Sequence, residues 1–511
     1  MHRLSLLVTL VGIAPAATTA QAPATRAPAV GCESLAQLKL PDIRITEAAS
    51  VDARENARVG VRVPHCRVRG VVGKEIRFLA LLPIGWNGRF LMGGGGGFVG
   101  SVNAPTEEVN VGYATSGTDT GHEGSGIQAG WALGNLERVV NYGHLAVHRV
   151  AEATKAVVRA YYGADAEYSY FLGCSNGGRQ ALMEAQRYPG DFDGIVSGAP
   201  AFDFTNIAHA FIKNIKAAFP VPTSPTPILT PDALKVIEAK VLEACDAADG
   251  IKDDTIDDPR SCRFRLESVP VCPGSTAGPG CLTRPQHRVA ATVYRAAADR
   301  AGRVYPGQPV GGEGQQGGWA DWITGRGGQP GSASLPSAQW GFGTEFFKYL
   351  VFHDSTWNYA TYDLANARRD TRLAATVLNA DNPDLSAFAG RGGRLLLWHG
   401  WSDPALNALS TIDYHGQVLA KTPAAQDHVR LFLMPGVLHC AGGTGPDRVD
   451  WAKAISTWVE TKTAPERIVA AKMGADGKPT RTRPLCGYPA RAVYRGTGST
   501  DEEVNFECQA P

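Results

Sequence analysis

The chain has 511 residues, with 50 Lys and Arg against 49 Asp and Glu and a formal net charge of +1. This balance creates no field that would attract nucleic acid or an acidic membrane surface, and we expect neither as a partner. The length suits one large domain with an insertion, or two domains.

The first twenty residues, MHRLSLLVTLVGIAPAATTA, have a short basic start, an apolar run and then small residues. This order is typical of a cleaved secretory signal, and the apolar run is shorter than the roughly twenty residues that a membrane anchor needs. We expect residues 1–20 to be a signal peptide, cleaved near Ala20 or alternatively after Ala16. The mature protein is then secreted or periplasmic.

Cysteines pair in the oxidising compartments that exported proteins enter. The chain has ten cysteines. The even number predicts five disulfides, although spacing alone leaves open which cysteines pair. No C-x-x-C spacing occurs, which argues against a zinc or thioredoxin-type site. Three pairs lie close in the sequence: Cys245 with Cys262, Cys272 with Cys281, and Cys486 with Cys508.

From residue 76 onward, apolar strand-like runs alternate with stretches of helical periodicity. This alternation is typical of a doubly wound α/β sheet. Strands are expected at 76–83, 89–97, 109–122 (with a polar loop at its end), 168–175 and 192–200, and helices at 135–162, which ends at Gly163, and at 177–189.

The alternation stops near residue 203, where the chain becomes rich in Pro, Gly and aromatic residues. It resumes with apolar runs at 393–403 and 429–440, which we expect to be late strands of the same sheet, followed by a helix at 447–462. The middle segment is therefore predicted to be an insertion into one sheet. The expected division is a signal peptide at 1–20, an α/β core at 21–202 and 382–511, and an inserted domain at 203–381.

The sequence GCSNGG matches the pattern G-x-S-x-G through Gly173, Ser175 and Gly177. The match alone is weak in a glycine-rich chain, and a plain glycine turn is the alternative. Here it lies between an aromatic strand and a helix, where a strained nucleophile turn requires small neighbours. We therefore interpret Ser175 as a nucleophile.

A serine hydroxyl needs an adjacent base, and in α/β-hydrolases the chain order is serine, acid, histidine. Asp403 follows one late strand in HGWSD, and His439 follows the next in PGVLHC. We expect His439 to be the base and Asp403 to orient it without taking its proton. His399 and Asp447 lie close in the sequence and are competitors for these roles.

A cysteine directly precedes Ser175, and another directly follows His439. Proton transfer brings the serine Oγ and the histidine Nε2 to about 3 Å, which makes the flanking residues near neighbours. A disulfide needs Cα atoms roughly 4.4–6.8 Å apart, so we expect Cys174 to be bonded to Cys440. The alternative, a free catalytic thiol, suits neither an exported protein nor a serine at this turn.

The negative oxygen that develops when a serine attacks a carbonyl needs backbone N–H donors. Asn176, at the start of the helix after Ser175, is expected to offer one, because a helix N-terminus favours negative charge. The second donor should come from the loop after an early strand, and the five glycines at 93–97 are placed for this. A nucleotide-phosphate loop is the rival use, but G-x-x-x-x-G-K-[ST] is absent.

The sequence CDAADGIKDDTIDD at 245–258 supplies Asp246, Asp249 and Asp253, with Gly250 allowing a tight loop. Hard oxygen donors at short spacing suit Ca²⁺. The spacing is not that of an EF-hand, and a solvated acidic loop is the alternative.

Together, GCSNGG, HGWSDPA and PGVLHCAGG resemble the tannase and feruloyl esterase family of α/β-hydrolases, and the likeness extends to WNGRFLMGGGGGFVG, FDGIVSGAP and RTRPLCGYPARAVYRGTG. The resemblance implies a lid domain at 203–381, the triad Ser175, Asp403 and His439, and an oxyanion hole made by the N–H groups of Gly97 and Asn176. It implies the disulfides Cys32–Cys66, Cys174–Cys440, Cys245–Cys262, Cys272–Cys281 and Cys486–Cys508. It also implies a structural Ca²⁺ in the lid, bound by Asp246, Asp249 and Asp253 and by the carbonyls of Ile251 and Thr255.

The expected substrate is a small aromatic ester, with a feruloyl, hydroxycinnamoyl or galloyl group. Lid aromatics suit such a ring, although packing in the lid core is the plainer interpretation for any one of them. These are Trp319, Trp322, Trp340, Phe342, Phe346, Phe347 and Trp357.

Two alternatives stay open. One is a mono-hydroxyethyl terephthalate hydrolase or a general carboxylesterase, although SAQWGFGTEF at 337–346 has no arginine for a carboxylate. The other is an exported calcium-dependent carbohydrate-binding protein, against which an intact triad argues.

Overall fold

The computed structural model describes residues 25–53, 60–224, 226–327 and 335–510, so the expected signal peptide lies outside the described residues. Its centre is a nine-stranded sheet with the order β1-β2-β3-β5-β4-β6-β7-β10-β11. The strands are β1 (Ile43–Val51), β2 (His65–Val72), β3 (Ile76–Pro83), β4 (Arg89–Gly93), β5 (Ala114–Thr118), β6 (Tyr168–Cys174), β7 (Gly194–Gly198), β10 (Arg394–Gly400) and β11 (Val429–Met434).

The sheet has an antiparallel edge and a parallel body. β1, β2, β3 and β5 pair antiparallel, whereas β5, β4, β6, β7, β10 and β11 are parallel neighbours. All strands of the parallel body therefore end at the same edge. This is the edge at which the nucleophile turn and the two late loops must meet.

Helices cover both faces of the sheet. The core helices are α1 (Leu136–Val140), α2 (Ala146–Tyr162), α3 (Asn176–Arg187), α10 (Ser386–Gly390), α11 (Ala408–Lys421) and α12 (Trp451–Thr461). Leu395 and Leu397 of β10 pack in one core cluster with α2, α3 and α11, whereas Leu396 and Trp398 pack in another with α12. The alternation follows from the two-residue period of a strand. Both faces of β10 are therefore buried.

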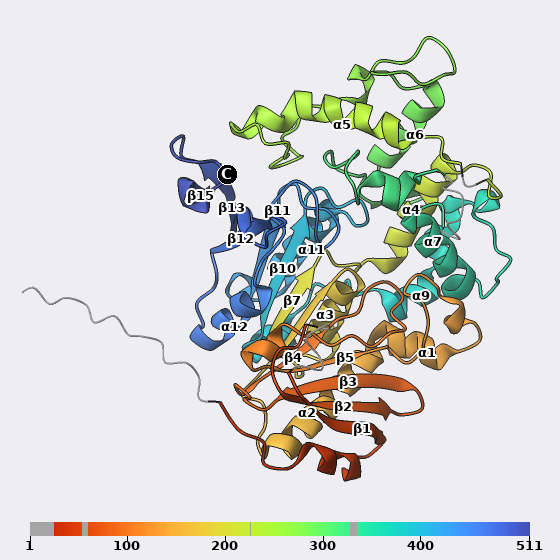
Figure 1. Cartoon of the computed structure of the whole chain (residues 1–511). Coiled ribbons are helices and arrows are strands. Elements are labelled where there is room, and N and C mark those ends of the chain that lie inside the picture. The colour runs from red at the N-terminus through yellow and green to blue at the C-terminus, as the bar shows by residue number, and fades with distance from the viewer. Residues whose placement is uncertain (1–24, 54–59, 225, 328–334, 511) are drawn as a thin grey trace, which may run out of the picture.

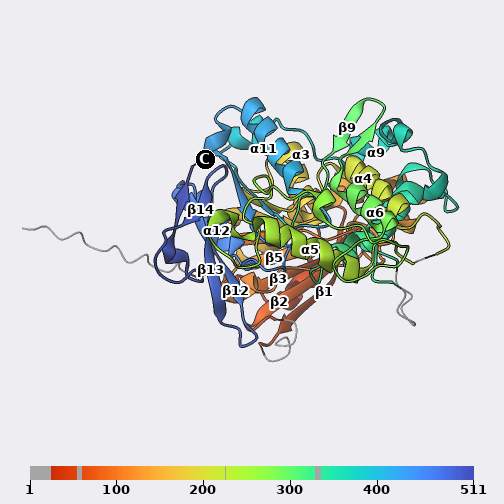
Figure 2. The ribbon, with the colours of Figure 1, turned by 90° about the horizontal axis from the view of Figure 1, so that it is seen from above.

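Residues 203–381, between β7 and β10, contribute no described strand to the large sheet. β7 and β10 nevertheless pair in continuous parallel register, from Gly194–Arg394 to Gly198–Trp398. Figures 1 and 2 show that α5 lies above the sheet. The elements of this segment are α4 (Phe204–Ala218), α5 (Pro231–Cys245), α6 (Arg284–Tyr294), β8 (Ala297–Asp299), β9 (Gly302–Tyr305), α7 (Ala338–Glu345), α8 (Ala367–Asp370) and α9 (Arg372–Leu378).

The C-terminal segment forms two hairpins beside α12 (Figures 1 and 2). They are β12 (Arg467–Met473) with β13 (Pro479–Cys486), and β14 (Arg491–Tyr494) with β15 (Phe506–Gln509). Among the described residues, no helix has the length and apolar character needed to cross a membrane.

Several of the expected elements differ from the structure. The strand expected at 109–122 is confined to β5 and follows a 3₁₀ turn at Glu108–Val111. The single helix expected at 135–162 is interrupted by a π-helical turn at Asn141–Leu145, although it ends at Gly163 as expected. The inserted segment also contains two 15-residue helices, α4 and α5, which its Pro- and Gly-rich composition did not predict.

Candidate active site

Ser175 lies at the turn between β6 and α3, with a positive φ of 64°. Its backbone is fixed on both sides, because its N–H donates to Gly198 O at 2.9 Å and its carbonyl accepts from Ala201 N at 3.0 Å. A Cβ on Gly173 would lie 2.4 Å from the backbone of Gly177, so only glycine fits there. The turn therefore holds a strained serine at the carboxyl edge of the sheet.

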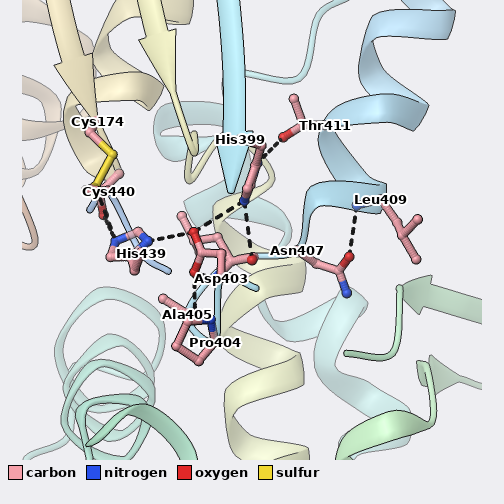
Figure 3. Close-up of polar contacts among 12 residues, drawn as sticks. Cys174, His399, Asp403, Pro404, Ala405, Asn407, Leu409, Thr411, His439 and Cys440 are labelled. Carbon is pink, nitrogen blue, oxygen red and sulfur yellow. Dashed lines mark hydrogen bonds and ion pairs between the residues drawn. A yellow bond between two sulfur atoms is a disulfide. The ribbon is translucent and has the colours of Figure 1, made fainter. Parts of the chain in front are cut away.

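His439 follows β11, and Asp403 follows β10, at the same edge. His439 Nε2 lies 2.9 Å from Ser175 Oγ, and His439 Nδ1 lies 2.8 Å from Asp403 Oδ2. Figure 3 shows the histidine and the aspartate facing each other, with the disulfide beside them. The three residues form a continuous hydrogen-bonded chain from carboxylate to imidazole to hydroxyl. Such a chain can move the hydroxyl proton to the imidazole.

Asp403 is 1% exposed and accepts hydrogen bonds on both carboxylate oxygens. Oδ1 accepts from the N–H groups of Ala405 and Leu406, at 2.8 and 2.9 Å. Oδ2 faces His439 and also His399 Nε2, at 3.3 Å. Burial raises the pKa of Asp403, but His439 and His399 outweigh burial and hold that pKa below its ordinary value. Asp403 therefore stays ionised.

The two competing residues from the sequence occupy different positions. His399 is fully buried at the end of β10, where Nδ1 lies 2.8 Å from Thr411 Oγ1. It contacts Asp403 (Figure 3), and its other polar partners among the described residues are Thr411 and the carbonyl of Leu406, not Ser175. Asp447 accepts from Gly442 N at 2.7 Å and pairs with Lys472 at 3.5 Å. Asp403, and not Asp447, therefore contacts the histidine that faces Ser175.

Cys174 and Cys440 are bonded, with their Cα atoms 6.0 Å apart (Figure 3). The bond joins residues 266 positions apart and ties the end of β6 to the loop after β11. Because the two cysteines are adjacent to Ser175 and His439, the bond holds these two residues close to each other. The other disulfides join the remaining pairs that the resemblance implied, and none of the described cysteines is free.

Gly97 and Asn176 lie beside Ser175 and His439 around one cavity. Gly97 has a φ of 54°, and a Cβ there would lie 2.2 Å from Gly126 O, so the position requires glycine. Among the described residues, no group accepts a hydrogen bond from the backbone N–H of Gly97 or of Asn176. Both donors are therefore available at the cavity.

The cavity over Ser175 is apolar. No Asp, Glu, Lys or Arg of the described residues lines it. Trp322 closes one side, with its ring 4.7 Å from the imidazole of His439 in an edge-to-face arrangement. Trp319, Trp340, Phe347 and Trp357 belong instead to the packing of the inserted segment. The apolar lining residues are Phe98, Ala201, Phe204, Ile207, Ala208, Phe211, Trp322, Phe342, Phe346, Ala405 and Leu406.

The proposed calcium ligands lie after α5, in a loop whose Asp249, Ile251, Asp253 and Thr255 line a shared cavity. Among the described residues, no three acidic, His or Cys side chains lie close enough together to hold a metal ion. Asp246 nevertheless has a buried Oδ2 without a hydrogen-bond partner. Burial raises the pKa of both Asp249 and Asp253. Of the three aspartates only Asp246 is buried, whereas Asp253 is half-buried and Asp249 is exposed. The loop therefore offers one unpartnered carboxylate oxygen of the kind that suits a hard cation.

Comparison with known proteins gives a consistent result. The family model "Tannase and feruloyl esterase" matches residues 60–509. The chain is 32% identical to mono(2-hydroxyethyl) terephthalate hydrolase from Piscinibacter sakaiensis, over 88% of this chain and 85% of that protein. It is 30% identical to feruloyl esterase B from Aspergillus niger, over 91% and 90%. The crystal structure of feruloyl esterase B from Aspergillus oryzae superposes with a TM-score of 0.83 at 27% identity, over 94% of this chain and 99% of that one.

Proposed function

The chain belongs to the tannase and feruloyl esterase family, and we propose that it is an exported serine esterase that hydrolyses esters of aromatic acids through an acyl-enzyme on Ser175. Family membership makes it a carboxylic ester hydrolase. The observation that carries the serine mechanism is the pair of contacts at His439, 2.9 Å to Ser175 Oγ and 2.8 Å to Asp403.

In the first half-reaction, His439 Nε2 takes the proton of Ser175 Oγ as that oxygen bonds to the ester carbonyl carbon. The negative charge that develops on the carbonyl oxygen is stabilised by the N–H groups of Gly97 and Asn176. The imidazolium then gives its proton to the departing alcohol oxygen. Asp403, which stays ionised, orients the ring and stabilises its positive charge.

In the second half-reaction, water takes the place of the alcohol. His439 removes a proton from the water, whose oxygen bonds to the acyl carbon. The Ser175 ester bond breaks, the serine regains its proton from His439, and the free acid leaves. The same N–H groups stabilise the second tetrahedral intermediate.

The acyl group is proposed to be an aromatic ring in the apolar cavity, between Trp322, Phe342 and α4. Burying a carboxylate in an apolar cavity is costly without a partner, and no charged side chain of the described residues lines this one. Burying a hydroxyl group without a hydrogen-bond partner also costs free energy, although less than burying a carboxylate. The cavity therefore favours a hydroxycinnamoyl group over galloyl, and galloyl over a carboxylate-bearing terephthaloyl group.

A structural Ca²⁺ is proposed in the loop after α5. Asp246, Asp249 and Asp253 would supply carboxylates, and Ile251 and Thr255 would supply backbone carbonyls. The ion would neutralise buried negative charge and stiffen the loop.

Export is supported by the disulfides and by the predicted signal peptide. Cytosolic thiols are kept reduced, so five disulfides are expected of a protein that works outside the cytosol.

An ester panel tests the proposal. Steady-state kcat/KM is measured on methyl ferulate, methyl gallate, mono(2-hydroxyethyl) terephthalate and p-nitrophenyl acetate, with Ser175→Ala as the matched inactive control. We expect methyl ferulate to exceed the terephthalate ester by about tenfold or more, which corresponds to about 1.4 kcal/mol. A preference for p-nitrophenyl acetate alone would contradict the aromatic-acid assignment. Full hydrolysis by Ser175→Ala would contradict the nucleophile.

A further inference from the structure

A fully buried arginine lies on the helix that follows the nucleophile. Arg179 is 0% exposed and sits one turn after Ser175, to whose carbonyl its backbone N–H donates at 3.1 Å. Within the described parts of the chain, no carboxylate lies within ion-pair distance of its guanidinium. The guanidinium donates instead to neutral oxygens: Asn176 Oδ1 at 2.8 Å, Gly143 O at 2.7 Å, Tyr142 O at 3.0 Å and Leu378 O at 3.2 Å.

This cation is next to the cavity wall. Its carbon Cζ lies 5.4 Å from the ring centroid of Phe204 and 4.8 Å from that of Tyr142. Phe204 and Asn176 both line the cavity over Ser175. The positive charge is therefore separated from the cavity by the side chains that it contacts, and it is not neutralised by a counter-charge. In a buried environment, such a charge favours any negative charge that develops nearby.

The side chain of Asn176 links Arg179 to the glycine loop at 93–97. Its Oδ1 accepts from Arg179 Nε, and its Nδ2 donates to Gly95 O at 3.0 Å. A guanidinium has only donors, so it turns the amide oxygen toward itself and the amide NH₂ toward Gly95. Gln180 completes the attachment, because its Oε1 accepts from Gly95 N at 2.9 Å.

Tyr142 provides a second link. Its hydroxyl lies 3.0 Å from Gly97 O and also 3.0 Å from Asn176 Oδ1, and it has one proton that it can donate to either oxygen. Tyr142 therefore contacts both the glycine loop and the amide oxygen to which Arg179 donates. The same arginine also holds the backbone carbonyl of Tyr142, at the π-helical turn that interrupts the helix after residue 140.

From these contacts we infer that Arg179 is a positioning residue for the oxyanion hole. It fixes Asn176 and Tyr142, which set the separation between the N–H groups of Gly97 and Asn176, and its charge favours the negative oxygen of the transition state. The inference rests on the proposed serine mechanism. A lysine would retain the charge but lose the fork that reaches several oxygens at once. Leu378, the last residue of α9, ties the inserted segment to the same guanidinium.

The test compares Arg179→Gln and Arg179→Lys with Arg187→Gln, a control two turns along the same helix. Arg187 also donates to an oxygen of the inserted segment, Thr376 O at 2.8 Å, but it is exposed and, among the described residues, makes no hydrogen bond to Asn176. For each variant, kcat and KM are measured on methyl ferulate. Inhibition constants are measured for phenylboronic acid, which forms a tetrahedral adduct on the serine, and for ferulic acid, the planar product.

We expect Arg179→Gln to lower kcat by about 100-fold, as loss of one oxyanion donor does, with KM changed by roughly threefold at most. The inhibition constant of the boronic acid should rise in parallel with the loss of kcat, whereas that of ferulic acid stays near the wild-type value. Arg179→Lys should lose less than Arg179→Gln, and Arg187→Gln should keep the wild-type values. If Arg179 only stabilised the fold, its substitution would change the inhibition constants of the tetrahedral and planar inhibitors to a similar extent.

Retention of kcat by a folded Arg179→Gln, or a loss of kcat without loss of boronic acid binding, overturns the inference. If Arg179→Gln does not fold, as judged by circular dichroism, Asn176→Ala decides. That variant keeps the backbone N–H of residue 176 but removes the amide side chain that links Arg179 to Gly95. We expect its inhibition constant for the boronic acid to rise while that for ferulic acid stays near the wild-type value. Wild-type values for kcat and for both inhibitors would overturn the inference. A wild-type protein without esterase activity would instead contradict the proposed function and this inference together.

Discussion

Asp403 experiences two opposed effects on its pKa. Burial raises the pKa, whereas the charge of His439 and the hydrogen bonds from His399 and His439 lower it by more. Since the folded-state pKa lies below the unfolded value near 4, this carboxylate stabilises the fold above about pH 4. That stability is lost as the pH falls through the folded-state pKa. Asp403 therefore stays ionised at neutral pH, as the proposed mechanism requires.

The second histidine, His399, is expected to be necessary for this ionisation. In His399→Phe, one donor to Asp403 Oδ2 is lost, so burial raises the pKa of that carboxyl. We predict that kcat/KM of His399→Phe falls at a higher pH on the acid side than kcat/KM of the wild type, because Asp403 is then protonated more easily. The difference in unfolding free energy between the wild type and His399→Phe should also become smaller as the pH falls below about 4.

The measurements are a pH–rate series and urea unfolding at pH 3 and pH 7. His415→Phe is the control, because His415 is also buried, on α11, but contacts the ring of Tyr488 and, within the described parts of the chain, makes no hydrogen bond or ion pair with the proposed triad. An acid limb of His399→Phe at the same pH as that of the wild type would contradict the assigned role.

The sequence predicted some of these residues and missed others for a physical reason. Ser175, Asp403 and His439 were predicted because each follows an apolar run at a strand end, in the order expected of a hydrolase. The roles of Arg179 and Tyr142 were not predicted, because their contacts form only when the glycine loop packs on α3. The sequence did contain one signal, because Arg179 is a charged residue within a helical segment that is otherwise buried.

At the scale of elements, the disulfide between Cys174 and Cys440 joins β6 to the loop after β11. We predict that Cys174→Ala/Cys440→Ala lowers kcat/KM by at least about tenfold. For that loss, misplacing Ser175 relative to His439 needs to raise the activation free energy by only about 1.4 kcal/mol. Closing a loop this long also stabilises by about 5 kcal/mol in the chain-entropy model, so the melting temperature should fall.

The control is Cys272→Ala/Cys281→Ala, whose disulfide spans 9 residues in the inserted segment. It should lower the melting temperature and leave kcat/KM near the wild-type value. Wild-type kcat/KM in a folded Cys174→Ala/Cys440→Ala variant would show that the bond does not position the triad.

The predictability of each element depended on its burial. β6, β7, β10 and β11 are buried parallel strands, whose continuous apolar runs are easily recognised. β1 was missed because its side chains are mostly half-buried or exposed and its sequence, IRITEAASV, includes charged residues. The C-terminal hairpins carry the same weak pattern. The helices α4 and α5 were masked by the Pro- and Gly-rich composition of the segment around them.

At the scale of the whole molecule, the inserted segment leaves and rejoins the sheet at adjacent strands, β7 and β10. A long insertion is tolerated there because the register between those strands is unbroken. The first inserted helix, α4, supplies Phe204, Ile207, Ala208 and Phe211 to the cavity. The proposed triad therefore belongs to the sheet edge, whereas much of the cavity proposed for the acyl group belongs to the insertion.

The proposed Ca²⁺ would act at this scale. Asp253 pairs with Arg483 at 3.0 Å and with Arg481 at 3.2 Å, which links the loop after α5 to the C-terminal hairpin β12–β13. We predict that EDTA lowers the melting temperature by a few degrees and that added Ca²⁺ restores it, because an ion that binds only the folded state stabilises it.

Asp246→Asn is the matched variant, which should melt at the EDTA temperature with or without Ca²⁺. Metal analysis of the purified protein should find about one Ca²⁺ per chain, a ratio set by the single proposed site. Identical melting of the wild type in EDTA and in Ca²⁺, with no bound metal, would contradict the site.

The central claim is that Ser175 is the nucleophile, and a phosphonate label tests it most directly. A p-nitrophenyl alkylphosphonate bonds through phosphorus to an activated serine oxygen and releases p-nitrophenolate, which leaves a stable ester. Intact-mass and peptide mass spectrometry then locate the label. We predict one label per chain, on the peptide that contains Ser175, with loss of esterase activity in step with labelling and no label on Ser175→Ala. Labelling at another residue, or full activity after Ser175 is labelled, would contradict the account.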